Sequence, residues 1–313
     1  MSGVISHIAN PTLDDAVALG VTSERGGARW IGFADAFWWR DVWMLLGAVA
    51  AATERIEIGP AMTNAYLRHP FHTASALATL HGLAPERVFC GLAAGGSEVT
   101  AAAHIDRRDA PERATALAAT IRAVADGQPL DEASGRRLDV PLPVTPLLMA
   151  GRGDGMLRAA GRTADRVLLW AMPDGDLDRS VSVVLDGAKG RATAPELIWA
   201  PLVRHPEITP ESLGHVAVYA ALNTRSELRM RWGLDHDRVE SIRRTLVAGG
   251  TAAAIDLVPG AALDDLTVDP DDSARVVRRA RQLGVTEIAV PGFAVHTVER
   301  QLAWAAAVEQ ELS

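Results

Sequence analysis

Short apolar segments alternate along the chain with longer segments in which apolar residues lie three or four positions apart. Short apolar runs are typical of buried strands, whereas the wider spacing is typical of one face of an amphipathic helix. The expected strands are residues 4–9, 29–39, 55–62, 87–94, 145–150, 165–171, 197–203 and 286–293. Amphipathic helices are expected at residues 41–54, 70–83, 110–127 and 269–284.

A start signal marks a further helix after the first strand. Asn10 is a candidate cap, and Pro11 occupies the first helical position. Asp14 and Asp15 fall in the first turn, where the helix dipole favours negative charge. We therefore expect a helix from residue 11 onward.

The eight apolar strands, with helices between them, predict a parallel sheet covered by helices. Eight such units close a (β/α)8 TIM barrel. A doubly wound open sheet is the alternative, but no G-x-G-x-x-G turn follows the first strand. Extra length is expected in a loop at residues 127–144, and in two or three helices within residues 204–285, between strands seven and eight. Because no linker or repeat interrupts the chain, we expect one domain over residues 1–313.

Composition and charge argue against several classes of protein. The 313 residues are 48% hydrophobic, enough for a large core, and the net charge of −8 disfavours binding to nucleic acid or an anionic membrane. No apolar run reaches the roughly 18–20 residues of a membrane span, and the first residues lack the features of a signal peptide. Cys90, the single cysteine, is expected to be a buried thiol in a reducing compartment. We therefore expect a cytoplasmic protein that acts on a small molecule.

In a barrel of this kind the site lies at the carboxyl ends of the strands, because the following loops converge there. The third expected strand ends at Thr63 and Asn64, which either line this mouth or form a capping turn. His7 and Asp35, on the first and second expected strands, are acid–base candidates, although a lone histidine on a strand is more often a hydrogen-bonded core residue. No zinc-binding or nucleophile motif appears in the sequence.

Glycines and tryptophans at other strand ends are further candidates. Gly151 and Gly153 free the backbone where the fifth strand turns into a helix, and exposed N–H groups at a helix start suit a phosphate. Trp38 and Trp39 fall at the end of the second expected strand, and Trp170 at the end of the sixth. Aromatic walls suit a planar ring and equally suit packing. Strand alternation allows only one of Trp38 and Trp39 to point inward, and we take this to be Trp38.

The block "GAVAAATERIEIGPAMTNAYLRHPFHTASALATLHGLAPERVFCGLAAGG" (47–96) carries Thr-Asn, Arg-His-Pro and a Gly-x-Ala-x-Gly strand end. It resembles the signature of the luciferase-like superfamily, which comprises flavin- or deazaflavin-dependent TIM-barrel oxidoreductases. The resemblance is closest to the branch that contains methylene-tetrahydromethanopterin reductase. It continues in residues 146–171 and 268–290, so that about half of the chain is covered in the expected order.

The resemblance implies roles for individual residues. Ala61 and Met62 would form a bend, often with a non-prolyl cis peptide, that supports the face of the cofactor ring. Thr63 and Asn64 would contact the ring edge or the ribityl chain, and the turn after strand five would hold a phosphate. The implied cofactor-binding residues are Trp38, Ala61, Met62, Thr63, Asn64, Ala94, Gly95, Gly96, Ala150, Gly151, Arg152, Gly153 and Trp170.

The chain departs from the family pattern after the second strand. Deazaflavin dehydrogenases of the family commonly carry Asp-His there, and "FADAFWWRDVWMLL" contains no histidine. Asp41 belongs to the nearest ionisable pair, but it also matches the aspartate that begins the following helix. The catalytic candidates are therefore His7, Asp35 and Asp41.

The resemblance implies an oxidoreductase that binds coenzyme F420 and moves a hydride between its C5 and a small organic substrate. Reduction of a C=C or C=N bond is favoured, because an alcohol dehydrogenase needs the base that is missing here. One alternative is a two-component monooxygenase that uses reduced FMN and O2, and another is a flavin-binding protein without turnover. Because the family often dimerises, we also expect a homodimer.

Overall fold

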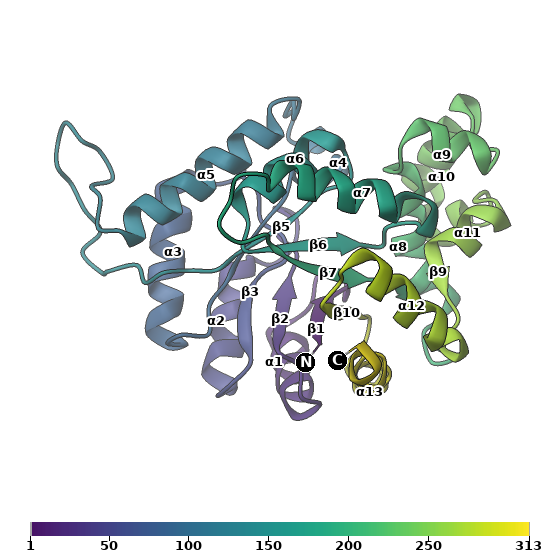
Figure 1. Ribbon diagram of the computed structural model, residues 1–313, viewed down its shortest axis with the longest axis horizontal. Helices are drawn as coiled ribbons and strands as arrows, with labels where there is room; N and C mark the ends of the chain where they lie inside the picture. Colours follow the sequence, from purple (N-terminus) through teal and green to yellow (C-terminus); the bar gives the residue numbers. More distant parts are fainter. Residues whose placement is uncertain (1, 313) are drawn as a thin grey trace.

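The computed structural model describes residues 2–312, apart from the side chains at positions 97, 98, 247, 249 and 251. Eight parallel strands form one sheet in the order β3-β2-β1-β10-β7-β6-β5-β4 (Figure 1). They are β1 (Gly3–Ser6), β2 (Trp30–Phe33), β3 (Glu57–Pro60), β4 (Cys90–Leu92), β5 (Leu147–Ala150), β6 (Arg166–Trp170), β7 (Glu196–Ala200) and β10 (Glu287–Gly292).

Backbone pairing curls this sheet into a barrel. Strand β1 pairs with β10 over its whole length, from Gly3 opposite Ala289 to Ser6 opposite Gly292. The two end strands, β3 and β4, meet through the isolated parallel bridges Ile58–Val88 and Thr63–Leu92. The expected TIM barrel is therefore confirmed, and the doubly wound alternative is wrong.

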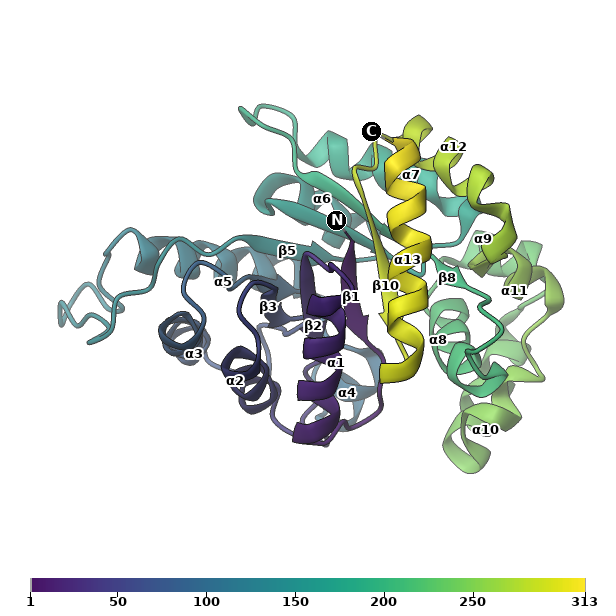
Figure 2. The same cartoon turned by 90° about the horizontal axis from the view of Figure 1, so that it is seen from below.

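Helices cover the outside of the barrel (Figure 2). They are α1 (Leu13–Arg25), α2 (Val42–Ala52), α3 (Pro70–Leu83), α4 (Ser97–Ala102), α5 (Ala110–Ala125), α6 (Asp154–Thr163), α7 (Asp174–Gly187), α12 (Ser273–Leu283) and α13 (Val295–Leu312). The loop expected at residues 127–144 joins α5 to β5 and extends away from the barrel (Figure 1). Among the helices of residues 2–312, none is long and apolar enough to cross a membrane.

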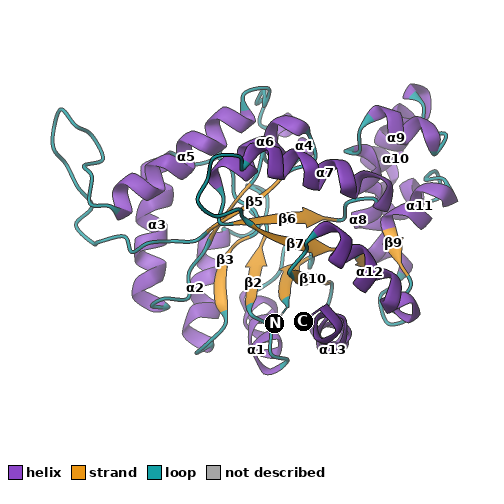
Figure 3. Ribbon diagram, in the orientation of Figure 1, coloured by secondary structure: helices purple, strands orange, loops and turns teal. Residues whose placement is uncertain are grey.

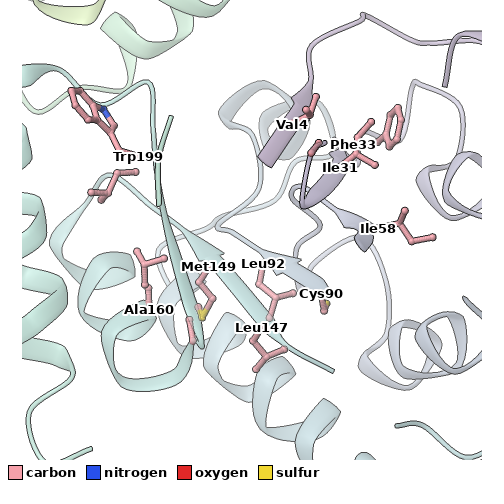
Figure 4. Packing of buried hydrophobic residues seen from close by; sticks show 14 of the residues in the cluster. Val4, Ile31, Phe33, Ile58, Cys90, Leu92, Leu147, Met149, Ala160 and Trp199 are labelled. Atoms are coloured by element: carbon pink, nitrogen blue, oxygen red, sulfur yellow. The ribbon is translucent and has the colours of Figure 1, made fainter. Parts of the chain in front are cut away.

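Two hydrophobic layers stabilise the barrel. The larger lies between strands and helices and includes Val4, Cys90 and Met149 (Figure 4). Burial raises the pKa of the Cys90 thiol to about 12. A second cluster comprises Ile5, Trp30, Phe89, Leu148, Leu168, Ile198, Ala200 and Ala289. Because side chains alternate along a strand, the neighbours Val4 and Ile5 belong to different layers, and this second cluster fills the barrel interior.

The segment between β7 and β10 is an insertion with a hydrophobic cluster of its own. It includes a small parallel sheet, β8–β9, of which Figure 3 labels β9. The insertion consists of β8 (Leu202–Val203), α8 (Pro210–Leu222), α9 (Ser226–Arg231), α10 (His236–Ile255), α11 (Gly260–Leu266), β9 (Thr267–Val268) and the 3-10 helix η1 (Pro270–Asp272). The single domain expected from the sequence stays a prediction.

The insertion differs from the expectation in two ways. It holds the four helices α8 to α11 instead of two or three, because α9 and α11, with 6 and 7 residues, are too short to show a helical period. In addition, the apolar run at residues 197–203 is not one strand. It breaks after Ala200, and Leu202 and Val203 pair with β9 instead of with the barrel.

The second strand is shorter than predicted. It ends at Phe33, and residues 34–41 form a loop in which the Trp39 N–H donates to the Ala36 carbonyl at 2.8 Å. Trp38 and Trp39 therefore do not alternate on a strand, and that prediction is wrong. The aromatic residues of the loop prolonged the apolar run past the true strand end.

Helix α1 begins later than predicted, because Thr12 is its cap. The Asp15 N–H donates to Thr12 Oγ1 at 3.0 Å, and the Thr12 N–H donates to Asp15 Oδ2 at 2.9 Å, which completes a capping box. Asn10 is not the cap: its side-chain oxygen accepts a hydrogen bond from the Arg40 N–H at 3.1 Å.

Charged side chains close the amino-terminal end of the barrel. Glu287, which is 3% exposed, accepts hydrogen bonds from Arg29 Nη1 at 2.9 Å and from the Trp30 indole. Glu57 in turn accepts from Arg166 Nη1 at 2.5 Å. Burial raises the pKa of Glu287 to about 7, against the opposing effect of Arg29.

Candidate functional site

The chain after β3 bends at the predicted position. The peptide bond between Ala61 and Met62 is cis, as the resemblance implied. Thr63, which is fully buried, then ties this segment to β4: its N–H donates to the Gly91 carbonyl at 2.9 Å and its carbonyl accepts from Ala93 at 3.0 Å. The bend is thereby held against the neighbouring strand at the barrel mouth.

Asn64 forms a capping turn, which is one of its two expected roles. Its Oδ1 accepts hydrogen bonds from the N–H groups of Tyr66 at 3.0 Å and Leu67 at 3.1 Å. His69 caps α3 by accepting from the Phe71 N–H through Nδ1 at 3.3 Å. These polar residues therefore shape the β3–α3 loop.

Asp35 lies beside Thr63 at the end of β2. Thr63 Oγ1 donates to Asp35 Oδ2 at 2.6 Å, and the Asp35 N–H donates to the Met62 carbonyl at 3.3 Å. Burial raises the pKa of Asp35, while the Thr63 hydrogen bond and the charge of Arg68 oppose this effect. A carboxyl group that keeps its proton to a higher pH is suited to act as a general acid.

Three of the predicted residues form the floor of the barrel mouth. Met62, Ala150 and Trp170 all pack on the cluster that fills the barrel interior. They come from the carboxyl ends of β3, β5 and β6. A floor of this composition offers apolar surface to a flat ring.

Four side chains from different strand ends, one of them Trp170 of this floor, contact one another at the mouth. The ring centroid of His7 lies 5.3 Å from that of Trp170 and 5.4 Å from that of Phe293. The Arg152 guanidinium carbon lies 5.6 Å from the Trp170 ring. The Trp170 indole N–H donates to His7 Nε2 at 3.1 Å, so that β1 and β6 are joined by a side-chain hydrogen bond.

His7 is a neutral imidazole. Burial lowers its pKa to about 3, and the nearby His215 contributes to the lowering. His7 is therefore hydrogen-bonded, as we expected for a lone histidine on a strand, and it carries no charge at neutral pH. It can donate or accept hydrogen bonds there, but it does not supply a proton.

Helix α6 begins without a side-chain cap. Gly153 occupies its N-cap position, and a side chain added there would meet no atom within 4 Å. The N–H groups of the first turn are therefore open to an anion. Gly151 serves packing instead, because a Cβ at this position would lie 2.5 Å from Met156 Cβ.

Arg152 is held against β6 by hydrogen bonds from Nη2 of its guanidinium group. Nη2 donates to the carbonyl groups of Trp170 at 3.0 Å and Ala171 at 2.9 Å, whereas Nη1 is buried with no partner in the described structure. Burial lowers the pKa of Arg152 to about 10, so the group stays charged at neutral pH. An unpaired buried donor next to an open helix start fits a phosphate-bearing ligand.

The end of β4 is a second glycine-rich turn. Gly95 has a φ of +82°, and its carbonyl accepts from Arg107 Nη1 at 2.8 Å. Gly96 is the N-cap of α4, again without a side-chain hydrogen bond, and the half-buried Ala94 packs against the larger core. The predicted Ala94–Gly96 segment therefore lies at the mouth next to Thr63.

A groove of about 540 Å³ adjoins Asp35 on the side of α2 and α3. Trp39, instead of the predicted Trp38, lies in its wall. Trp38 is 44% exposed and meets the Phe37 ring edge-on, with centroids 4.9 Å apart. The groove is lined by Asp35, Ala36, Phe37, Trp39, Asp41, Leu67, Arg68, His69 and His72.

Asp41 is the aspartate that begins α2, as the second interpretation of the sequence held. Its Oδ1 accepts from the Trp43 N–H at 2.9 Å, and its other oxygen pairs with Arg68. Both oxygens of Asp41 are thus used by the structure. In the part of the chain that the structure describes, no group of three or more histidine, cysteine or acidic side chains could hold a metal ion.

Sequence reasoning missed two residues of the mouth. Phe293 ends the eighth expected strand, and its place at a carboxyl end was a usable signal. His215 belongs to α8, and nothing in the sequence places this inserted helix close to His7.

Known proteins resemble the chain over most of its length. The sequence profile described as luciferase-like monooxygenase matches residues 2–287. Methylenetetrahydromethanopterin reductase of Methanopyrus kandleri is 25% identical over 282 residues, or 79% of each chain. F420-dependent glucose-6-phosphate dehydrogenase of Beutenbergia cavernae is 36% identical over 131 residues, which is 38% of this chain and 39% of that protein.

The fold also matches a solved structure. The F420-dependent tetrahydromethanopterin reductase of Methanopyrus kandleri superposes with a TM-score of 0.80 at 20% identity, covering 99% of this chain and 98% of that one. At this identity the likeness concerns the fold, which is the barrel described above.

Proposed function

Because the chain belongs to the luciferase-like monooxygenase family, we propose that it is an F420-dependent oxidoreductase acting on a small organic substrate. Relatives that are named as F420-dependent enzymes or as a reductase support this cofactor. Reduction of a C=C or C=N bond is the favoured reaction. The mouth contains a carboxyl group suited to give a proton, that of Asp35, and residues 33–46 lack the histidine that could act as the base of a dehydrogenase. When bound, the deazaflavin supplies or accepts the hydride at its C5.

The observation that carries the proposal is the combination of an apolar floor and an open helix start at one barrel mouth. Met62, Ala150 and Trp170 offer apolar surface to the ring. The first turn of α6 after Gly153, together with the unpaired Nη1 of Arg152, would hold the phosphate. Thr63 positions Asp35, which would protonate the substrate.

Titration of the purified protein with oxidised F420 and with FMN, followed by tryptophan fluorescence, tests this proposal. We expect F420 to quench the fluorescence at micromolar concentration, because Trp170 belongs to the floor. The variant Gly153→Asp should weaken binding by about tenfold or more, since it places a carboxylate at the phosphate position. Asp is a good cap, so the helix itself should keep its stability.

Gly260→Asp is a matched control for this experiment. Gly260 begins α11, is exposed, and likewise has no atom within 4 Å of an added Cβ. We expect its affinity for F420 to equal that of the wild type. Binding of neither cofactor, or equal losses in both variants, would contradict the proposal.

A two-component monooxygenase that uses reduced FMN is the second candidate, and the description of the matching family favours it. Preference for FMN in the same titration would support this candidate. Tight binding of F420 without turnover over a panel of substrates would support a flavin-binding protein instead.

We also propose a homodimer. Helix α2 is apolar over its whole length, and it exposes Met44, which is 69% accessible. Light scattering after size exclusion should give twice the chain mass for the wild type and the single chain mass for Met44→Glu. A monomeric wild type would refute the proposal. The cytoplasmic location expected from the single cysteine stays a prediction.

A further inference from the structure

His7 is fixed at the barrel mouth by contacts that use only one of its ring nitrogens. Its ring contacts those of Trp170 and Phe293, and its backbone N–H donates to the Gly292 carbonyl at 2.9 Å. Nε2 accepts the hydrogen bond from the Trp170 indole. The ring therefore has a defined position and a defined orientation.

This hydrogen bond determines the tautomer of His7. An indole N–H is a donor only, so Nε2 must act as an acceptor and carries no proton. In the neutral ring the proton is then on Nδ1. Among the described residues, none accepts a hydrogen bond from Nδ1, and this nitrogen is not one of the buried polar atoms without a partner. The Nδ1–H group is thus open to a ligand.

We propose that the Nδ1–H of His7 donates a hydrogen bond to the carbonyl oxygen of the substrate, and that the substrate is an α,β-unsaturated carbonyl compound. This inference rests on the proposed function and specifies its substrate class. In the net reaction a hydride and a proton from Asp35 add across the C=C bond, the hydride donor is oxidised by two electrons, and the C=O bond is retained.

The chemistry of C=C reduction supports this class. An isolated C=C bond accepts a hydride poorly, whereas a conjugated carbonyl group takes up the developing negative charge on its oxygen. A fixed donor at that oxygen stabilises the charge, and a neutral imidazole performs this role in other enzymes. The rings of Trp170 and Phe293 lie next to the imidazole and give it apolar neighbours, and a hydrogen bond is stronger in apolar surroundings. A C=N nitrogen, in contrast, requires a proton, which neutral His7 does not give.

Long-range 1H–15N spectra of the protein labelled with 15N-histidine, with oxidised F420 bound, test the proposal without turnover. We expect the His7 signals to show a protonated Nδ1 and an unprotonated Nε2. Cyclohex-2-en-1-one should shift the Nδ1 signal, and cyclohexene, which lacks the oxygen, should leave it unchanged. The variant His7→Phe, in which these signals are absent, provides their assignment.

Two variants extend the test. Trp170→Phe removes the donor to Nε2, so we expect His7 to show both tautomers. His7→Phe keeps an aromatic ring and should bind cyclohex-2-en-1-one about tenfold more weakly. His236→Phe, at an exposed position at the start of α10, is the matched control and should bind it as the wild type does.

A proton on Nε2 in the wild type, or an Nδ1 signal that saturating cyclohex-2-en-1-one does not shift, would overturn this inference. Either result with F420 bound leaves the proposed function intact. Failure of F420 to bind contradicts the proposed function, while the tautomer of His7 can still be read from the protein alone.

Discussion

The two aspartates near the end of β2 differ in what their oxygens contact. Asp41 caps α2 with one oxygen and pairs with Arg68 through the other. Asp35 accepts a single hydrogen bond from Thr63 through Oδ2, and burial raises its pKa. Only Asp35 is therefore available to exchange a proton with a ligand.

We expect Asp35→Asn to lower kcat by about a hundredfold or more, which is the usual contribution of a general acid. Its affinity for F420 should be unchanged, because the amide keeps the shape and still accepts from Thr63. Asp41→Asn is the comparison: asparagine is an equally good cap, so activity should fall far less. Steady-state kinetics with a substrate that the wild type converts measure kcat for both variants. An equal decrease of kcat in the two variants would assign no special role to Asp35.

His7 makes stability depend on pH in a predictable direction. Its pKa of about 3 in the folded chain lies below that of an unfolded histidine, so the folded state binds fewer protons. The stabilisation is full above pH 6.5 and decreases as the pH falls toward 3. Between pH 6.5 and 4.5 the wild type should lose about 2–3 kcal/mol relative to His7→Phe, measured by urea unfolding. A constant difference over this range would contradict a His7 that stays neutral in the folded chain.

The site could be predicted in part, because its motifs are local. The turn at Asn64 followed from the residues around the end of β3, and the cis bond at Ala61–Met62 followed from the resemblance that the same short block carries. The exposed position of Trp38 did not, since an apolar run gives no sign of where a strand ends. The contact of Trp170 with His7 joins residues that lie far apart in the chain, and no local pattern reports such a pair.

At the scale of elements, helices α6 and α7 pack unusually closely through two glycines. A Cβ on Gly161 would lie 2.0 Å from the Val184 carbonyl oxygen, and one on Gly187 would lie 2.3 Å from the Arg158 carbonyl oxygen. Any side chain at these positions would push the two helices apart. The start of α6, where we place the phosphate, depends on this packing.

We therefore expect Gly161→Ala to lower the free energy of unfolding by about 1–3 kcal/mol, because the added methyl group meets backbone atoms. Gly82→Ala is the matched control: Gly82 lies in α3 with no atom within 4 Å of an added Cβ. That variant should be more stable than the wild type by about 0.5–1 kcal/mol, since alanine favours the helix. Denaturant unfolding checks both, and destabilisation by both would refute the steric explanation.

Most strands and helices of the barrel could be predicted, because their burial is reflected in the spacing of apolar residues along the sequence. The strands around Ile31, Ile58 and Leu148 are short apolar runs, and the helices between them show a three-to-four spacing. Pairing partners are not encoded locally, so the separate β8–β9 sheet was missed. The cap of α1 was missed because Asn10 and Thr12 are both good caps, and the capping box with Asp15 decides between them.

At the scale of the whole molecule, the base of the barrel depends on a charged cluster that the strands bring together. Glu287 has a pKa of about 7 in the folded chain, above that of an unfolded glutamate, so the folded state binds more protons. The associated stabilisation is full below about pH 4.5 and is lost as the pH rises through 7.

We expect the wild type to lose up to about 3 kcal/mol of stability between pH 4.5 and 7.5 relative to Glu287→Gln, whose side chain does not titrate. Urea unfolding of both proteins at several pH values measures this difference. A difference that stays constant, or that grows in the opposite direction, would show that Glu287 is charged over the whole range.

The junction between β3 and β4 is short, and it lies at the site. Strands β3 and β4 meet only through the bridges at Ile58–Val88 and Thr63–Leu92, whereas β1 and β10 are paired throughout. Local opening of the barrel wall should therefore begin at the junction between β3 and β4. We expect the amide of Thr63 to exchange with deuterium faster than that of Ile5. A ligand seated on Met62, next to Thr63, would hold the two strands together at this junction. Its binding would then be felt as a stiffening of the entire barrel, well beyond the residues that it touches.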